Sequence, residues 1–422
     1  MFEKTNRLLV PVAALLLSLF TGNVLAQTGQ CGEQRNVMVR ALDELTWKQL
    51  NAIYEDVGEE KYDEAYEDLL KMVRRAGKNE YLQAVMYQAL AQVEWSRKNY
   101  DESLRYFELA VGLDTLPDQT HFALMYQIAQ LYFMKDRYQD SLEALGLWFC
   151  KVPPDQVSSH AYVLKASINV QKEDYREALK AIETAIGMEA EPKENWYQLK
   201  LAAHFELEQY PQAAATLELM ITRWPDKKSY WLQLVQVYYK LEQEDKALAI
   251  MAMAYRKNLL DKQSDITYLS SLYSNKNVPY KAAEVLEKGI RDGIVEPSKS
   301  HWTMVAETWY GAEELQRSLV AFQEAGKAAE DGDIDLRRGF ILVDLEDWQQ
   351  ARAALDEALR KGGLNDRRTG EAYLLRGMAQ FNLKNFDAAS ADWVRAARYE
   401  STRDAARQWI NHLREERLRR AS

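Results

Sequence analysis

The chain has 422 residues, of which 47% are hydrophobic and 28% are charged, and its net charge is −10. This composition is typical of a folded globular protein and not of a disordered chain. The excess of acidic residues argues against a nucleic-acid-binding protein, because such a protein needs a basic face to displace the counterions of the phosphates.

Residues 1–26 have the pattern of a cleavable signal peptide. Lys4 and Arg7 precede an apolar run over residues 8–20, and Val24 and Ala26 supply small residues before a cleavage point. The apolar run is shorter than the ~20 residues that span a bilayer. We therefore expect cleavage after Ala26, a periplasmic location, and no integral membrane segment in the mature chain.

Residues 27–42 are expected to form an N-terminal tail. This tail contains Cys31, and the only other cysteine of the chain is Cys150. In an exported protein the two can form a disulfide, although the tail would then have to fold back across two repeats. The sequence leaves open whether they pair or stay as two isolated thiols.

One small residue recurs every 33 to 38 positions over residues 43–398. Its positions are Ala65, Ser103, Ser141, Ala178, Ala213, Ala247, Ala282, Ser318, Ala351 and Ala389. A period of this length that is repeated ten times is typical of a solenoid built from helical repeats. The sequence therefore predicts an all-α fold.

Each repeat contains two apolar stripes with helical spacing. In the sixth repeat, Trp231, Leu234 and Tyr238 lie on one face of a first helix, and Ala247 and Met251 lie on one face of a second. An aromatic residue stands three positions before the small residue in seven repeats: Tyr62, Tyr100, Tyr138, Tyr175, Tyr210, Trp348 and Phe386. We expect the small residue to let the two helices approach closely and the aromatic residue to fill the turn.

This recurring pattern resembles the tetratricopeptide repeat (TPR) family. The resemblance implies a right-handed superhelical solenoid of about ten helix-turn-helix repeats. It also implies that the first helix of each repeat lines a concave groove. Two rows, eight and eleven residues before the small residue, would then face this groove. The candidate partner-binding residues in these rows are Gln92, Trp95, Gln130, Phe133, Phe205, Gln236, Tyr239 and Tyr310.

Aromatic and glutamine side chains in a groove suit an extended or helical peptide, because they combine flat apolar contacts with groups that hydrogen-bond to a backbone. The alternative is that these aromatic residues only pack the repeats against one another. Both interpretations are open at this point.

Residues 399–422 are predicted to form a capping helix with a basic tail. Ala405, Trp409, Ile410 and Leu413 give it one apolar stripe, and the exposed last interface of a solenoid needs such a cap. The arginines of the tail either complement the helix C-terminus or form a docking patch for an acidic partner or lipid headgroups.

No catalytic, metal-binding or cofactor-binding pattern is found in the sequence. The five histidines lie in different repeats without metal-ligand spacing. Nucleophile elbows and phosphate-binding glycine loops are also lacking. We therefore expect a binding protein that is not an enzyme, with no cofactor and no metal.

The layout of a signal peptide, about ten divergent repeats and a cap resembles the periplasmic TPR proteins that accompany TonB–ExbB–ExbD systems. Residues 195–203 and 230–239 carry this likeness. The resemblance implies an accessory role in TonB-dependent transport, with a TonB-type or ExbD-type periplasmic domain as partner. The alternatives are an assembly factor for outer-membrane protein or polysaccharide export and, with less support, an envelope hydrolase.

Overall fold

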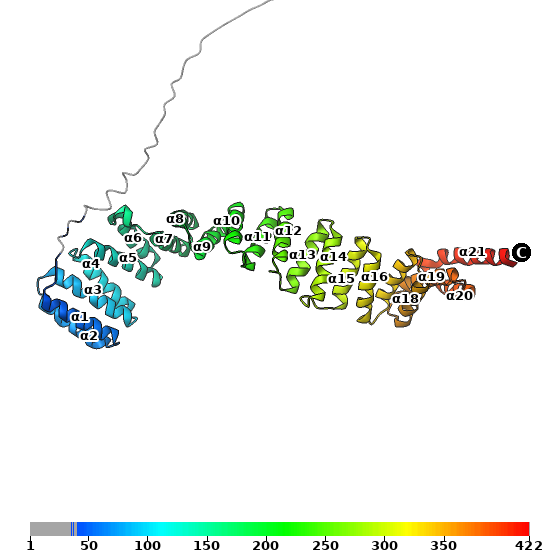
Figure 1. Ribbon diagram of the computed structural model, residues 1–422, viewed down its shortest axis with the longest axis horizontal. Helices are drawn as coiled ribbons and strands as arrows, with labels where there is room; N and C mark the ends of the chain where they lie inside the picture. Colours follow the sequence, from blue (N-terminus) through cyan, green and yellow to red (C-terminus); the bar gives the residue numbers. More distant parts are fainter. Residues whose placement is uncertain (1–34, 36, 38–39, 422) are drawn as a thin grey trace, which may run out of the picture. The chain divides into compact units, whose positions relative to one another are not determined.

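The computed structural model describes residues 35, 37 and 40–421, and every regular element in these residues is a helix (Figure 1). The predicted all-α fold is thus confirmed. The predicted signal peptide and Cys31 lie outside the described residues. The disulfide between Cys31 and Cys150 therefore stays a prediction, although Cys150 is not a free thiol.

The chain divides into two compact units, with the boundary after Thr216. In the N-terminal unit, successive helices pair as antiparallel hairpins that stack on one another. The helices are α1 (Glu44–Gly58), α2 (Tyr62–Ala76), α3 (Glu80–Ser96), α4 (Tyr100–Gly112), α5 (Asp118–Met134), α6 (Tyr138–Lys151), α7 (Ser159–Gln171), α8 (Tyr175–Gly187) and α9 (Glu194–Glu206). A short 3₁₀ helix, η1 (Pro154–Gln156), lies between α6 and α7.

The unit boundary falls within α10 (Tyr210–Arg223), and the C-terminal unit continues with further hairpins. Its helices are α11 (Lys228–Lys240), α12 (Glu244–Arg256), α13 (Gln263–Asn275), α14 (Pro279–Arg291), α15 (Lys299–Gly311), α16 (Leu315–Lys327), α17 (Asp333–Asp344), α18 (Trp348–Lys361), α19 (Asp366–Asn382) and α20 (Phe386–Ala396). The turn η2 (Glu400–Thr402) and α21 (Arg403–Ala421) end the described chain.

The ten recurring small residues all lie in the first turn of a second helix, and all are 0% exposed. Where the residue is serine, its hydroxyl donates a hydrogen bond to a carbonyl oxygen of the first helix twelve residues earlier. Ser103 donates to Ala91 at 2.8 Å and Ser318 donates to Ala306 at 2.8 Å. The small side chain thus lets the backbones of the two helices pass close to each other.

In the last two hairpins the close approach needs a glycine on the first helix as well. A Cβ atom added to Gly377 would lie 2.4 Å from the indole nitrogen of Trp393, and one added to Gly339 would lie 2.5 Å from Leu355. Both distances are shorter than a van der Waals contact, so any larger residue would push the second helix away.

The turn inside each hairpin contains a residue in the left-handed region, always five positions before the small residue. These residues are Glu60, Lys98, Asp136, Glu173, Glu208, Glu242, Asn277, Glu313, Glu346 and Lys384. The backbone N–H of the next residue donates a hydrogen bond to a carbonyl oxygen of the first helix. The N–H of Asn99, for example, donates to the carbonyl oxygen of Glu94 at 2.9 Å. This is the Schellman end of a helix, but here it is formed without glycine.

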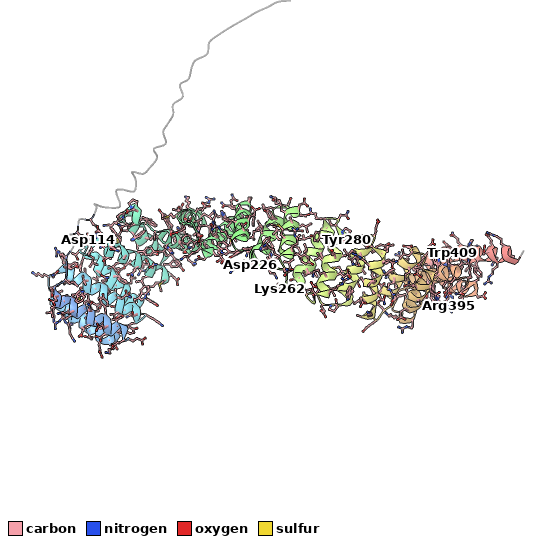
Figure 2. The ribbon with its side chains drawn as sticks, in the orientation of Figure 1. Asp114, Asp226, Lys262, Tyr280, Arg395 and Trp409 are labelled. Carbon is pink, nitrogen blue, oxygen red and sulfur yellow. The ribbon has the colours of Figure 1, made fainter. Side chains whose placement is uncertain are left out.

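The N-terminal tail is held against the unit at Arg35 and Arg40. The Arg35 side chain is 4% exposed. It forms an ion pair at 2.6 Å with Asp118, the first residue of α5, and another at 2.6 Å with Asp114, which is labelled in Figure 2. Its guanidinium also donates to the carbonyl oxygen of Leu116 at 2.9 Å. The Tyr81 hydroxyl donates to the carbonyl oxygen of Arg40 at 2.7 Å.

The last helix, α21, packs on α20 as a cap. Trp409, labelled in Figure 2, stacks on Trp393 of α20 with ring centroids 5.2 Å apart. Leu413 is buried as expected, and Trp409 and Ile410 are partly buried. The fully buried alanine of the stripe is Ala406 and not Ala405, because the helix turns its adjacent face toward α20.

Candidate functional site: the inner face of the repeats

The first helices of the hairpins form the inner face of each unit. In the N-terminal unit α5 contacts α7 and α7 contacts α9, and in the C-terminal unit α17 contacts α19, although a second helix separates each pair in the sequence. In the described part of the chain, neighbouring second helices are not in comparable contact. The side on which the helices approach more closely is the concave side of a stack.

Two predicted groove residues of the N-terminal unit pack within their own hairpins. Trp95 meets the turn residue Tyr100 edge-on with ring centroids 5.6 Å apart, and Phe133 meets Tyr138 at 5.8 Å. Both are only partly exposed and belong to hydrophobic clusters of the repeats. For these two aromatic residues the structure thus shows a packing role.

Other predicted residues face solvent. Tyr239 is 52% exposed and Tyr310 is 50% exposed, both near the end of a first helix. Gln236 lies one turn before Tyr239 on α11 and is exposed, as is Gln92 on α3. Phe205 and Gln130 are partly buried. The eight residues therefore do not form one surface, and their role in binding stays a prediction.

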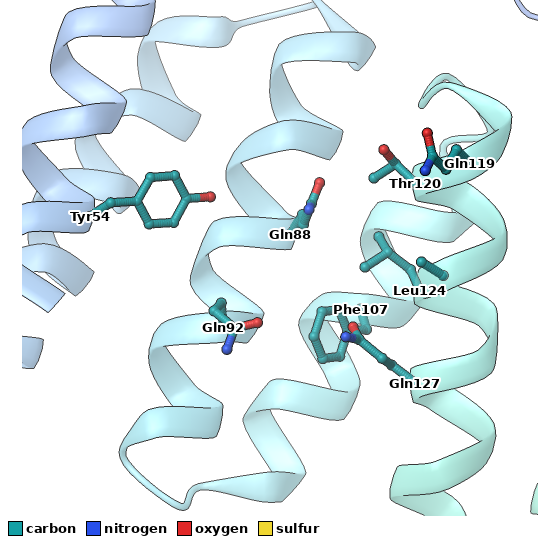
Figure 3. Close-up of a pocket in the computed structure, with 9 residues that line it drawn as sticks. Tyr54, Gln88, Gln92, Phe107, Gln119, Thr120, Leu124 and Gln127 are labelled. Atoms are coloured by element: carbon teal, nitrogen blue, oxygen red, sulfur yellow. The ribbon is translucent and has the colours of Figure 1, made fainter. Parts of the chain in front are cut away.

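A hollow of about 280 Å³ lies on the inner face of the N-terminal unit (Figure 3). It is lined by Tyr54 from α1, Gln88 and Gln92 from α3, Phe107 from α4, and Gln119, Thr120, Ala123, Leu124 and Gln127 from α5. Figure 3 shows Tyr54 pointing from α1 toward Gln88 and Gln92. We call this site the amide hollow because four of its nine lining residues are glutamines.

The amide hollow has no charged lining residue. Tyr54 is 41% exposed, and the partial burial of its side chain raises the pKa of its hydroxyl above the ordinary value. The hydroxyl therefore stays protonated near neutral pH and remains a donor. The side-chain oxygen of Gln127 is buried and has no hydrogen-bond partner among the described residues. A buried acceptor without a donor lowers the stability of the fold by about 1–3 kcal/mol.

A second hollow, of about 320 Å³, lies on the inner face of the C-terminal unit. Its lining residues are Glu307 and Tyr310 from α15, Phe322 from α16, Arg337, Phe340 and Ile341 from α17, and Arg368 and Glu371 from α19. We call this site the aromatic hollow. Arg337 pairs with Glu307, and Arg368 pairs with Asp333. Phe340, which is 39% exposed, and Tyr310 provide accessible rings between these ion pairs.

The two hollows use the same positions of the repeat with different chemistry. Gln92 and Phe340 both stand eleven residues before their small residue, and Ala123 and Glu371 both stand eighteen residues before theirs. Because these positions face the groove in every hairpin, one fold can present a neutral surface in one unit and a charged, aromatic surface in the other.

The rows chosen from the sequence contain Gln92, Glu307, Tyr310 and Phe340, but they miss most of the other lining residues. Gln88 stands fifteen residues, and Gln127 fourteen residues, before the small residue, so both lie outside these rows. They lie one helical turn beyond the row at eleven residues, so counting back one further turn finds them. Phe107 and Phe322 could not be found in this way, because they reach the hollows from second helices.

One histidine lies close to the tail. His121 is 3% exposed, and its burial and the nearby Arg35 guanidinium lower its pKa to about 4. In the described residues, no group of three or more His, Cys, Asp or Glu side chains is arranged to hold a metal ion. A search of the described helices also finds none that is both long enough and apolar enough to cross a membrane.

Family models described as tetratricopeptide repeat match three parts of the sequence, at residues 84–115, 159–192 and 336–407. A comparison with curated proteins finds no match.

Solved structures that are similar to this chain include a tetratricopeptide repeat protein from Parabacteroides merdae. It is 12% identical, with a TM-score of 0.38, and the match covers 67% of this chain and 93% of that chain. The TPR2AB domain of yeast Sti1, solved in a pHSP90 complex, is 16% identical, with a TM-score of 0.31 and coverage of 60% and 96%. The Cut9–Hcn1 structure of the APC/C is 13% identical, with a TM-score of 0.28 and coverage of 89% and 79%.

Proposed function

Because the chain contains tetratricopeptide repeats, we propose that it is a scaffold that holds a protein partner on the inner face of its first helices. The observation that carries this proposal is that each unit has a lined hollow on its inner face. Repeats of this kind present extended concave surfaces, and their folds are generally used for binding and not for catalysis.

The two hollows support recognition of a protein segment more than that of a small substrate. Each is an open depression spread over three first helices, with side chains from several repeats. A small-molecule site usually encloses most of its ligand. An open surface of polar and aromatic groups is instead suited to a peptide or to a loop of a folded partner.

We propose further that the protein works in the periplasm as an accessory component of a TonB-dependent transport system. The support comes from the sequence: the signal-peptide pattern of residues 1–26 and the resemblance to periplasmic TPR proteins of TonB–ExbB–ExbD systems. The partner would then be a TonB-type or ExbD-type periplasmic domain. No cofactor and no nucleic acid enter this proposal.

Site-specific photo-crosslinking in cells tests the proposal. A photoreactive residue is placed at Gln92 or Thr120 for the amide hollow and at Tyr310 for the aromatic hollow. The matched control is Gln212, an exposed residue of a second helix. We expect one defined protein to be captured from an inner-face position and not from Gln212, and mass spectrometry identifies it.

The outcomes separate the two parts of the proposal. A TonB-type or ExbD-type protein supports both parts. A different envelope protein supports the scaffold and rejects the transport role. Equal capture from Gln212 and from all inner-face positions would reject the inner face as the binding surface. Cell fractionation gives an independent check of the location, since a cytoplasmic protein would rule out the periplasmic role.

A further inference from the structure

We propose that the amide hollow binds an extended segment of the partner that carries no charged side chains, and that it recognises this segment mainly through the N–H and C=O groups of its main chain. This inference rests on the proposed scaffold function and specifies what the N-terminal unit would hold. Three observations carry it: the lack of charge, the free amides, and their spacing.

The inner face of the N-terminal unit is neutral well beyond the hollow. The positions eighteen, fifteen, eleven and eight residues before the small residue contain no Asp, Glu, Lys or Arg in any of its first four repeats. In the whole chain, by contrast, 28% of the residues are charged. A charged ligand group would lose water here without gaining a counter-charge, which is unfavourable. The surface therefore selects a neutral segment.

The side-chain amides of the glutamines in the hollow make no hydrogen bonds to other described residues. In the described part of the chain, no hydrogen bond involves the side chains of Gln88, Gln92, Gln119 or Gln127, and the buried oxygen of Gln127 has no donor. Each glutamine offers two N–H donors and one acceptor oxygen. A peptide group offers one donor and one acceptor, so it complements such an amide.

The spacing of the amides matches that of an extended chain. Gln88 and Gln92 are separated by four residues of α3, which is a rise of about 6 Å, and Gln119 and Gln127 by eight residues of α5, about 12 Å. Peptide groups that face the same way along a strand recur every two residues, about 6.6–6.8 Å. A strand between α3 and α5 can therefore bond to both rows, with Phe107 and Leu124 beneath alternate side chains.

An oligosaccharide fits the same surface less well. Sugar rings need the free faces of aromatic side chains, but on this inner face Trp95 and Phe133 pack on turn residues and Tyr126 packs on Trp148 at 5.4 Å. Among the residues that line the hollow, only Tyr54 is an exposed ring. The observations therefore favour a peptide.

Titration with short synthetic peptides, followed by NMR of the glutamine side-chain amides, tests the inference on the whole mature chain. The probe is the blocked neutral peptide acetyl-(Ser-Ala-Thr-Val)2-amide. The comparison probes are the same peptide with alternate backbone nitrogens methylated, the same peptide with both Thr replaced by Lys or by Glu, and maltohexaose. We expect the neutral peptide to shift the amide signals of Gln88, Gln92 and Gln127. The methylated and charged peptides should bind at least tenfold more weakly.

Variants that remove the amide and keep the shape provide the second arm. Gln92→Met and Gln127→Met should weaken binding of the neutral peptide at least fivefold. Gln212→Met, on a second helix away from the hollow, should not change it. Gln127→Met also removes an unsatisfied buried acceptor, so it should not lower the melting temperature. Loss of binding in this variant cannot then be explained by unfolding.

Several results would overturn the inference. Equal binding of the methylated peptide would show that the hollow does not recognise the main-chain N–H groups. Equal binding of a charged peptide would show that the hollow does not select against charged side chains. Shifts caused by maltohexaose and not by the peptide would assign the hollow to a glycan. If no probe moves the amide signals while crosslinking still captures a partner on the inner face, this inference fails and the scaffold function stands. If the inner face captures nothing, both fail.

Discussion

The hydroxyl of Ser103 donates a hydrogen bond of 2.8 Å to the carbonyl oxygen of Ala91, twelve residues earlier, in a contact where both residues are fully buried. This contact recurs between Ser141 and Ala129 at 2.6 Å. It marks the point at which the two helices of a hairpin are closest, and it explains why only alanine or serine occupies the recurring position. A larger side chain would separate the backbones.

Replacing Ser103 by alanine should therefore cost little and replacing it by leucine should cost much. Alanine fits, since seven repeats already use it, and the loss of one hydrogen bond should lower the free energy of unfolding by less than ~1 kcal/mol. Leucine overpacks the contact and should cost about 1–3 kcal/mol. Urea denaturation of both variants measures the difference, and equal stability of the two would contradict the packing role.

Replacing Glu60 by glycine should stabilise the first hairpin. Glu60 has a φ of +62°, where a residue with a Cβ is strained. Relief of this strain exceeds the gain in unfolded-state entropy, so we expect a net gain of about 0.5–1 kcal/mol. The control is Glu67→Gly in the middle of α2, which should destabilise by about 1 kcal/mol. Hydrogen exchange of the α2 amides measures both, and slower exchange is expected only for Glu60→Gly.

Replacing Arg35 by alanine should release the N-terminal tail. The variant loses two ion pairs and the bond to the carbonyl oxygen of Leu116. Asp114 and Asp118 are half exposed and can be rehydrated, so the cost should be modest, about 1–2 kcal/mol. Exchange of the amides of Val37, Arg40 and Ala41 should become faster. Arg176→Ala, an exposed arginine of α8, should leave it unchanged. Unchanged protection in the Arg35 variant would mean that other contacts hold the tail.

Stability should fall on acidification partly because of His121. Its pKa is about 4 in the folded protein and near 6.5 when unfolded, so the unfolded state takes up the proton first as the pH falls. The stabilisation is complete above pH 6.5 and is lost between pH 6.5 and 4, by about 3 kcal/mol. His121→Leu should show a shallower fall over this window. If the free energy of unfolding falls with pH in the same way for the wild-type protein and for His121→Leu, this explanation is wrong.

The aromatic residues of the inner face should divide into two classes. Trp95→Ala should lower the free energy of unfolding by about 3 kcal/mol, because Trp95 packs on Tyr100 within the cluster of the first repeats. Tyr310→Ala should change it by less than ~0.5 kcal/mol, because the ring is half exposed. If Tyr310→Ala is as destabilising as Trp95→Ala, then the ring of Tyr310 is part of the core and is not available to a partner.

The sequence alone determined the helical repeats. Two helices of one hairpin are close in the chain, so their contact leaves a local, periodic mark: the buried small residue, the turn aromatic, and the apolar stripes of Trp231 or Trp302. The small residue appears ten times and the turn aromatic seven times, and repetition makes a weak local signal strong. The cap at α21 could be predicted for the same reason, since its stripe of Trp409 and Leu413 has helical spacing.

Tertiary structure decided which of these residues face a partner. Trp95 and Tyr310 occupy the same position of the repeat, yet Trp95 packs on Tyr100 while Tyr310 has no aromatic turn residue before its small residue and stays exposed. The hollows depend on three successive first helices at once, and the docking of Arg35 on Asp118 joins residues 83 positions apart. Such contacts produce no periodic pattern in the sequence. They depend on how neighbouring hairpins pack side by side, and not on the contact between the two helices of one hairpin.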